Sequence, residues 1–203
     1  RIERKGGIVI GKSNTPEFGA GGSTFNEVFG RTRNPWNTDH ITGGSSTGSG
    51  AAVAGGLCLG SLGEDTAGSI RNPAAFCGIA GLKATYGRVS RHGLAPLSWS
   101  LDHCGPMARV VEDLAYMLNV LAGHDANDPT SSTQPTADYT AALREDVTNL
   151  RIGVPRELFG EGLDAEVRTA VEAAVDVYRR DHFAHLYACN LGFRRAPSAG
   201  DAR

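Results

Sequence analysis

Glycine is concentrated in one short stretch of this chain. Residues 43–68 hold nine of the 27 glycines among the 203 residues. Glycine loses more conformational freedom on folding than any other residue, so such a stretch is costly unless the backbone must adopt a positive φ or approach another group closely. The stretch therefore predicts tight loops whose backbone N–H groups come close to a ligand or to another part of the chain.

Two serine-bearing loops lie in this stretch and directly after it. The first, Gly43–Gly50, reads GGSSTGSG, and the second, Asp65–Arg71, reads DTAGSIR. A serine hydroxyl between small residues can reach a planar carbonyl carbon without obstruction, and successive backbone N–H groups of such a loop can bind a developing oxyanion. Two such loops so close together favour a catalytic site over a pair of ordinary Gly-Ser turns.

Two other serine arrangements fit parts of the pattern. The first loop matches G-x-S-x-G with Ser46 as the nucleophile, but that motif requires a preceding strand, and residues 34–40 do not have a strand pattern. Ser69 could also combine with His103 and Asp102. Lone histidines more often have structural roles, so this arrangement carries little weight.

Outside the loops, the pattern alternates strands with helices. Strands are expected at residues 6–11, 57–62 and 150–154, and helices at 108–122, 139–145 and 164–179. Such alternation predicts an α/β fold with a mixed, largely parallel central sheet flanked by helices. From residue 181 onward the sequence has no clear period and predicts no structured element.

Composition limits the class of protein. The 20 Lys and Arg residues nearly balance the 22 Asp and Glu residues, which gives no electrostatic indication of binding to nucleic acid or to a membrane. The longest run of small and apolar residues, 51–60, is about half of a membrane span. The four cysteines form no C-x-x-C pair and are expected to be reduced thiols of a cytoplasmic protein. The chain starts at Arg1, and we expect it to be a piece of a longer protein.

Beyond these separate features, the region from Gly43 to Gly105 resembles the signature of the amidase signature family of serine hydrolases. The resemblance rests on several motifs in order: GGSSTGS at 43–49, DTAGSIR at 65–71, CGIAGLK at 77–83, YGRVS at 86–90 and SLDHCGP at 100–106. It implies a partial amidase-signature domain over residues 1–179, followed by a divergent tail at 180–203.

The family resemblance implies a Ser–cis-Ser–Lys mechanism at an amide carbonyl. Ser69 is similar to the acylated nucleophile, and Ser45 to the bridging serine that follows a cis peptide bond. The backbone amides of Thr66, Ala67, Gly68 and Ser69 resemble the oxyanion hole. Ser46, Asp65 and Arg71 are similar to supporting residues, the last two as a charged pair. The family's catalytic lysine lies further upstream of Ser45 than this chain extends, and no cofactor or metal is implied.

The resemblance leaves three functions open. One is an amide hydrolase acting on a small-molecule amide, which could be a homo-oligomer. Another is the A subunit of an aminoacyl-tRNA amidotransferase, which releases ammonia from glutamine within an assembly of several subunits. The third is a catalytically inactive fragment.

Overall fold

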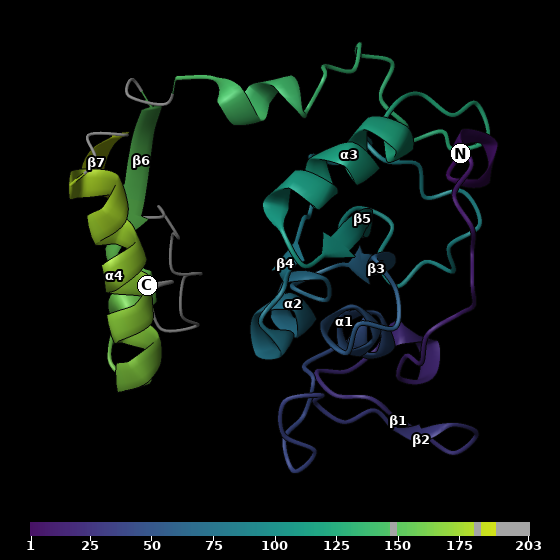
Figure 1. Ribbon diagram of the computed structural model, residues 1–203, viewed down its shortest axis with the longest axis horizontal. Coiled ribbons are helices and arrows are strands. Elements are labelled where there is room, and N and C mark those ends of the chain that lie inside the picture. Colours follow the sequence, from purple (N-terminus) through teal and green to yellow (C-terminus); the bar gives the residue numbers. More distant parts are fainter. Residues whose placement is uncertain (147–149, 181–183, 190–203) are drawn as a thin grey trace, which may run out of the picture. The chain divides into compact units, whose positions relative to one another are not determined.

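The chain folds into two compact units, Arg1–Leu143 and Arg144–Arg203. Our computed structural model describes residues 1–146, 150–180 and 184–189 (Figure 1). The helices of the first unit are α1 (Thr47–Ala54), α2 (Arg71–Cys77) and α3 (Val111–Leu121). Its strands are β1 (Phe25–Asn26), β2 (Gly30–Arg31), β3 (Gly60–Asp65), β4 (Ala80–Gly81) and β5 (His103–Ala108). Short 3-10 helices lie at Glu3–Lys5, Glu17–Gly19 and Ala141–Arg144.

The main sheet of the first unit is antiparallel. Its strand order is β3-β5-β4, and β5 runs opposite to both neighbours. The prediction of a largely parallel sheet was therefore wrong for this unit. The crossover from β3 through α2 does bring β4 back in the same direction as β3, but β5 lies between them. Alternation of strands and helices gives parallel neighbours only when consecutive strands are adjacent in the sheet.

Helices cover both faces of this sheet, with α1 and α2 on one face and α3 on the other (Figure 1). On the α2 face, Ile70, Ala74 and Met107 form a buried cluster. On the α3 face, Val89 packs with Leu118 and Leu121, which lie three residues apart on the buried side of α3. The predicted helix at 108–122 is confirmed, although it starts three residues later.

The second unit is built around a parallel strand pair. Strand β6 (Leu150–Pro155) is followed by a 3-10 helix (Arg156–Phe159), helix α4 (Ala165–Arg180) and strand β7 (Ala184–Cys189). The Asp164 carboxylate accepts the N–H groups of Glu166 and Val167 and so caps α4, as a helix start requires. Strand β7 pairs in parallel with β6 although its own sequence predicted no element. The strand depends on its partner rather than on a pattern of its own.

Two predicted strands differ from the structure. Residues 6–11 form no strand, and Ile8 is 87% exposed. Their β-branched, apolar sequence favours extended backbone, but no strand pairs with them in the described part of the chain. The strand expected at 57–62 lies at Gly60–Asp65 instead, with Leu57 and Leu59 exposed before it. The helix expected at 139–145 is only the 3-10 helix Ala141–Arg144.

Two further observations concern the cysteines and the lengths of the helices. Cys58, Cys77 and Cys104 are free thiols. Across the described ranges, every helix is too short or too polar to pass through a membrane.

Candidate active site

The loop that leads into α1 is closely packed. Residues 42–50 are all buried, and the peptide bond between Gly44 and Ser45 is cis, as the resemblance implies. A Cβ atom on Gly44 would overlap the backbone of Gly21 and Gly22. Only glycine leaves room for this approach, and it places the backbone of Ser45 in a fixed position.

Serines of this loop attach α1 to the open edge of β3. The Ser46 hydroxyl donates to the Glu64 carbonyl and accepts from the Glu64 N–H, both at 3.1 Å. The Ser49 hydroxyl donates to the Leu62 carbonyl at 2.7 Å. Glu64 and Leu62 are alternate residues whose backbone groups point away from β5, so the two hydroxyls satisfy polar groups that an edge strand leaves unpaired. Ser46 thus connects the loop to β3, whereas its supporting role in catalysis stays a prediction.

Asp65 organises the second loop from inside the sheet. Its side chain is fully buried and accepts hydrogen bonds from the N–H groups of Gly68 at 2.7 Å and Ile70 at 3.1 Å. Arg71 adds a bidentate pair through Nε at 3.0 Å and Nη2 at 3.1 Å. Asp65 and Arg71 therefore form an ion pair, whereas their supporting role in catalysis stays a prediction. Burial alone would raise the pKa of Asp65, but the bonds from Arg71 and from the loop amides hold that pKa below its usual value.

The Thr66–Ser69 loop turns at Gly68, whose φ of +140° suits glycine alone. Because the Gly68 N–H donates to Asp65, it is already engaged. The amides of Thr66, Ala67 and Ser69 form no hydrogen bond with the described part of the chain. The oxyanion role of Thr66, Ala67, Gly68 and Ser69 stays a prediction. In this geometry, three of these four amides are available to bind an oxyanion.

The two serine loops touch each other directly. The N–H of Ser46 donates to the carbonyl of Ser69 at 3.1 Å. Ser45 is buried, with 7% of its surface exposed, whereas Ser69 is partly exposed at the start of α2. The catalytic roles of both residues are predictions, but the fold brings their backbones together.

A Ser-His-Asp arrangement is absent from the described residues. His103 Nδ1 lies 2.6 Å from the Leu101 carbonyl, and its Nε2 lies 3.3 Å from Lys83 Nζ. Asp102 binds other groups instead of this ring: the Thr66 hydroxyl at 2.6 Å and the N–H groups of Leu97 and Ser98 at 2.8 Å. The sequence did not predict the contact between Asp102 and Thr66, because the two residues are 36 positions apart and only the β3–β5 register brings them together.

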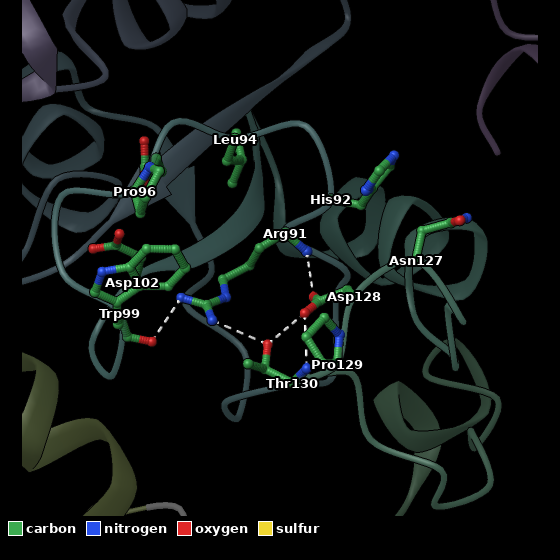
Figure 2. A pocket seen from close by; sticks show the side chains of 11 residues that line it. Arg91, His92, Leu94, Pro96, Trp99, Asp102, Asn127, Asp128, Pro129 and Thr130 are labelled. Atoms are coloured by element: carbon green, nitrogen blue, oxygen red, sulfur yellow. Dashed lines mark hydrogen bonds between the residues drawn. The ribbon is translucent and has the colours of Figure 1, made fainter.

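A pocket of about 220 Å³ opens beside Asp102 (Figure 2). Its walls come from the end of β3, the loop around residues 91–102 and residues 127–130. Figure 2 shows Arg91 crossing this pocket, with hydrogen bonds from its guanidinium to the Trp99 carbonyl at 3.1 Å and the Thr130 hydroxyl at 3.0 Å.

Glu64 also lines this pocket, and one of its carboxyl oxygens is unpaired within the described part of the chain. Its Oε1 is buried and makes no hydrogen bond to any described residue. Burial and the nearby charge of Asp102 raise the pKa of Glu64, and Arg91 opposes that rise. Burial, followed by the charge of Glu64, raises the pKa of Cys104 on β5 to about 11, so this thiol is not a nucleophile at neutral pH.

Comparison with known proteins agrees with the resemblance found in the sequence. The family model described as Amidase matches residues 1–187. The chain belongs to this amidase family. The match extends past residue 179 into β7, although the predicted division into a domain and a tail stays a prediction.

Relatives within the family include amidotransferase subunits and amidases. The chain is 55% identical over 179 residues to the A subunit of a glutamyl-tRNA(Gln) amidotransferase of Roseiflexus sp. (strain RS-1), a match over 88% of this chain and 37% of the relative. The crystal structure of the glutamyl-tRNA(Gln) amidotransferase A subunit from Thermotoga maritima superposes with a TM-score of 0.89 at 37% identity, covering 94% of this chain and 42% of that one. The peptide amidase from Stenotrophomonas maltophilia gives a TM-score of 0.81 at 38% identity, over 92% and 40% of the two chains. The chain thus spans about two fifths of the length of these relatives.

Proposed function

We propose that this chain carries the serine residues of an enzyme that cleaves carboxylic amides. The contact between the two serine loops is the main support, because the Ser46 N–H binds the Ser69 carbonyl and so holds the backbone of Ser45 beside that of Ser69. Membership of the amidase family is a second, independent support.

In the proposed reaction, Ser69 Oγ attacks the carbonyl carbon of the amide. The negative charge that develops on the carbonyl oxygen is stabilised by the free amides of the Thr66–Ser69 loop. The C–N bond then breaks, the amine leaves with a proton, and the acyl group stays on Ser69 as an ester. Water cleaves this ester, which releases the carboxylic acid and restores the hydroxyl.

The proton of Ser69 needs a route to a base. The hydroxyl of Ser45 can accept one proton while it donates another, so it can relay the Ser69 proton onward. The proposed base is a lysine outside these 203 residues. The described lysines do not replace it, since Lys5 and Lys12 are exposed and Lys83 contacts His103.

The test is a serine substitution in the protein as isolated from its source. Ser69→Ala should lower amide cleavage at least about a thousandfold, because the group that forms the acyl-enzyme is gone. The matched control Ser100→Ala removes an exposed hydroxyl outside both loops and should keep full activity. Equal activity of Ser69→Ala and wild type would overturn the proposed nucleophile.

A second candidate function is that of an amidotransferase A subunit, in which glutamine is the amide and the released ammonia passes to a partner subunit. The 55% identity to a relative of that name favours it. Release of ammonia from glutamine but not from a simple amide such as propionamide, together with co-purifying subunits, would support this candidate. The opposite preference would favour a free-standing amidase.

A third outcome is an inactive fragment. It would be supported if neither amide is cleaved and if a fluorophosphonate probe fails to label Ser69 in the native protein. Cytoplasmic location, homo-oligomer formation and the absence of nucleic-acid or membrane binding stay predictions.

A further inference from the structure

Asp102 binds the Thr66–Ser69 loop at Thr66, whereas Asp65 binds it at Gly68. Only 2% of Asp102 is exposed, and its Oδ1 accepts the Thr66 hydroxyl at 2.6 Å. A bond this short to a buried carboxylate is a strong one. Thr66 therefore has a fixed side chain at the point where β3 ends and the loop begins.

The second oxygen of Asp102 anchors that carboxylate. Oδ2 accepts the N–H groups of Leu97 and Ser98, each at 2.8 Å. The backbone of Asp102 directly precedes β5, whose first residue His103 is paired with Asp65. Asp102 is thus held both by the sheet and by the 97–98 turn, and it offers Thr66 a rigid acceptor.

The contact with Asp102 restrains the Thr66 Cα atom, from which the next peptide plane extends. That plane carries the Ala67 N–H, one of the three loop amides that remain available, while Asp65 already engages the Gly68 N–H at the other end of the loop. Asp65 restrains Ala67 only from its C-terminal side, because its bonds begin at the Gly68 N–H and continue to Ile70 and Arg71. The Thr66 hydroxyl is the side-chain contact on the N-terminal side of Ala67.

We propose that Asp102 is a positioning residue that acts through the Thr66 hydroxyl to aim the Ala67 amide at the oxyanion. This inference rests on the proposed amide cleavage at Ser69. Asp102 itself touches no reacting atom. Its effect is to hold a donor in place before charge develops, and such preorganisation is the usual source of oxyanion stabilisation.

The chain contains a matched control on the other side of the pocket. Asp128 is also buried and accepts the Thr130 hydroxyl at 2.6 Å, together with the N–H groups of Thr130 at 2.9 Å and Arg91 at 2.7 Å. Like Asp102, Asp128 accepts one threonine hydroxyl and two backbone N–H groups, but it has no hydrogen bond to the Thr66–Ser69 loop. Figure 2 shows Asp102 and Asp128 on separate walls.

The experiment compares Thr66→Val with Thr130→Val in the native protein, since each replaces a hydroxyl by a methyl group of similar volume. For Thr66→Val we expect kcat and the rate of Ser69 acylation to fall about tenfold, with KM nearly unchanged. Thr66→Ser keeps the hydroxyl and should recover most of the rate. Thr130→Val is the control for a purely structural loss: it should lower thermal stability by a comparable amount, while its kcat should fall clearly less than that of Thr66→Val.

Each outcome decides the inference. Equal losses of kcat in Thr66→Val and Thr130→Val would mean that the Asp102 contact supports only the fold, and would overturn the proposal. A Thr66→Ser variant that is as slow as Thr66→Val would overturn it as well, because the hydroxyl is then not what matters. If the wild type forms no adduct at Ser69, the proposed function fails. If the wild type forms the adduct and Thr66→Val forms it at the same rate, only the present inference fails.

Discussion

Glu64 and Asp65 are adjacent carboxyl residues at the end of β3, but they face opposite sides of the sheet. Asp65 turns toward α2, where loop amides and Arg71 donate to both of its oxygens. Glu64 turns toward the pocket, where its Oε1 is buried without a hydrogen bond from any described residue. The pKa of Asp65 is accordingly lowered and that of Glu64 raised. Burial raises the pKa of both groups. The N–H donors around Asp65 reverse this effect, whereas the nearby charge of Asp102 adds to it at Glu64.

The largest effect that tests this comparison is expected for Asp65→Asn. The variant replaces one acceptor oxygen by an NH₂ group that faces N–H donors, so several bonds to a fully buried group are lost together. We expect the free energy of unfolding to fall by about 3 kcal/mol, mostly from the amide bonds, because Arg71 is half exposed and its ion pair is screened. Urea denaturation measures this loss.

The control for that variant is Asp39→Asn, which changes an exposed aspartate. It should alter the free energy of unfolding by less than about 0.5 kcal/mol. A similar small effect for Asp65→Asn would contradict the view that Asp65 organises the loop.

The pH dependence sharpens the comparison. Since the pKa of Asp65 is lowered on folding, its carboxylate contributes stability above the usual pKa, and this contribution is lost as the pH falls through the lowered value. The difference in unfolding free energy between wild type and Asp65→Asn should therefore shrink as the pH is lowered from 7 to the acid range. Denaturation at a series of pH values gives the slope, and a difference that grows on acidification would contradict this assignment.

The smallest effect is expected for Glu64→Gln, and it has the opposite sign. The raised pKa of Glu64 means that its contribution is present at low pH and is lost as the pH rises through the raised value, when the buried group must ionise. Glutamine does not ionise. At pH 8 the variant should be more stable than wild type by up to about 1 kcal/mol, and at low pH the gain should vanish. A variant that is less stable at every pH would mean that the contact of Glu64 with Asp102 stabilises the fold by more than the burial of its charge costs.

The sequence alone located the two loops of this candidate site, because glycine density and serine motifs are local features. The roles of Ser45 and Ser69 and the pairing of Asp65 with Arg71 came from the family resemblance. The structure shows the ion pair, whereas the catalytic roles stay predictions. The strand direction could not be found in the same way. Whether β5 lies between β3 and β4 depends on long-range pairing, and no local pattern encodes it.

Contacts between residues on different strands could not be predicted from the sequence either. Asp102 was considered only as a partner for a histidine, whereas in the structure it binds the hydroxyl of Thr66. The engagement of the Gly68 amide by Asp65 was likewise hidden, since a glycine-rich motif does not say which of its N–H groups the fold has already used. Such assignments require the register of β3 against β5.

The most direct test of the proposed nucleophile is chemical labelling of the native protein with a fluorophosphonate, followed by peptide mapping. We predict one covalent adduct on Ser69, which is strongly reduced in Ser45→Ala because the proton relay is lost. An adduct on another serine, or no adduct in a folded protein, would contradict the proposal that Ser69 is the acylated nucleophile.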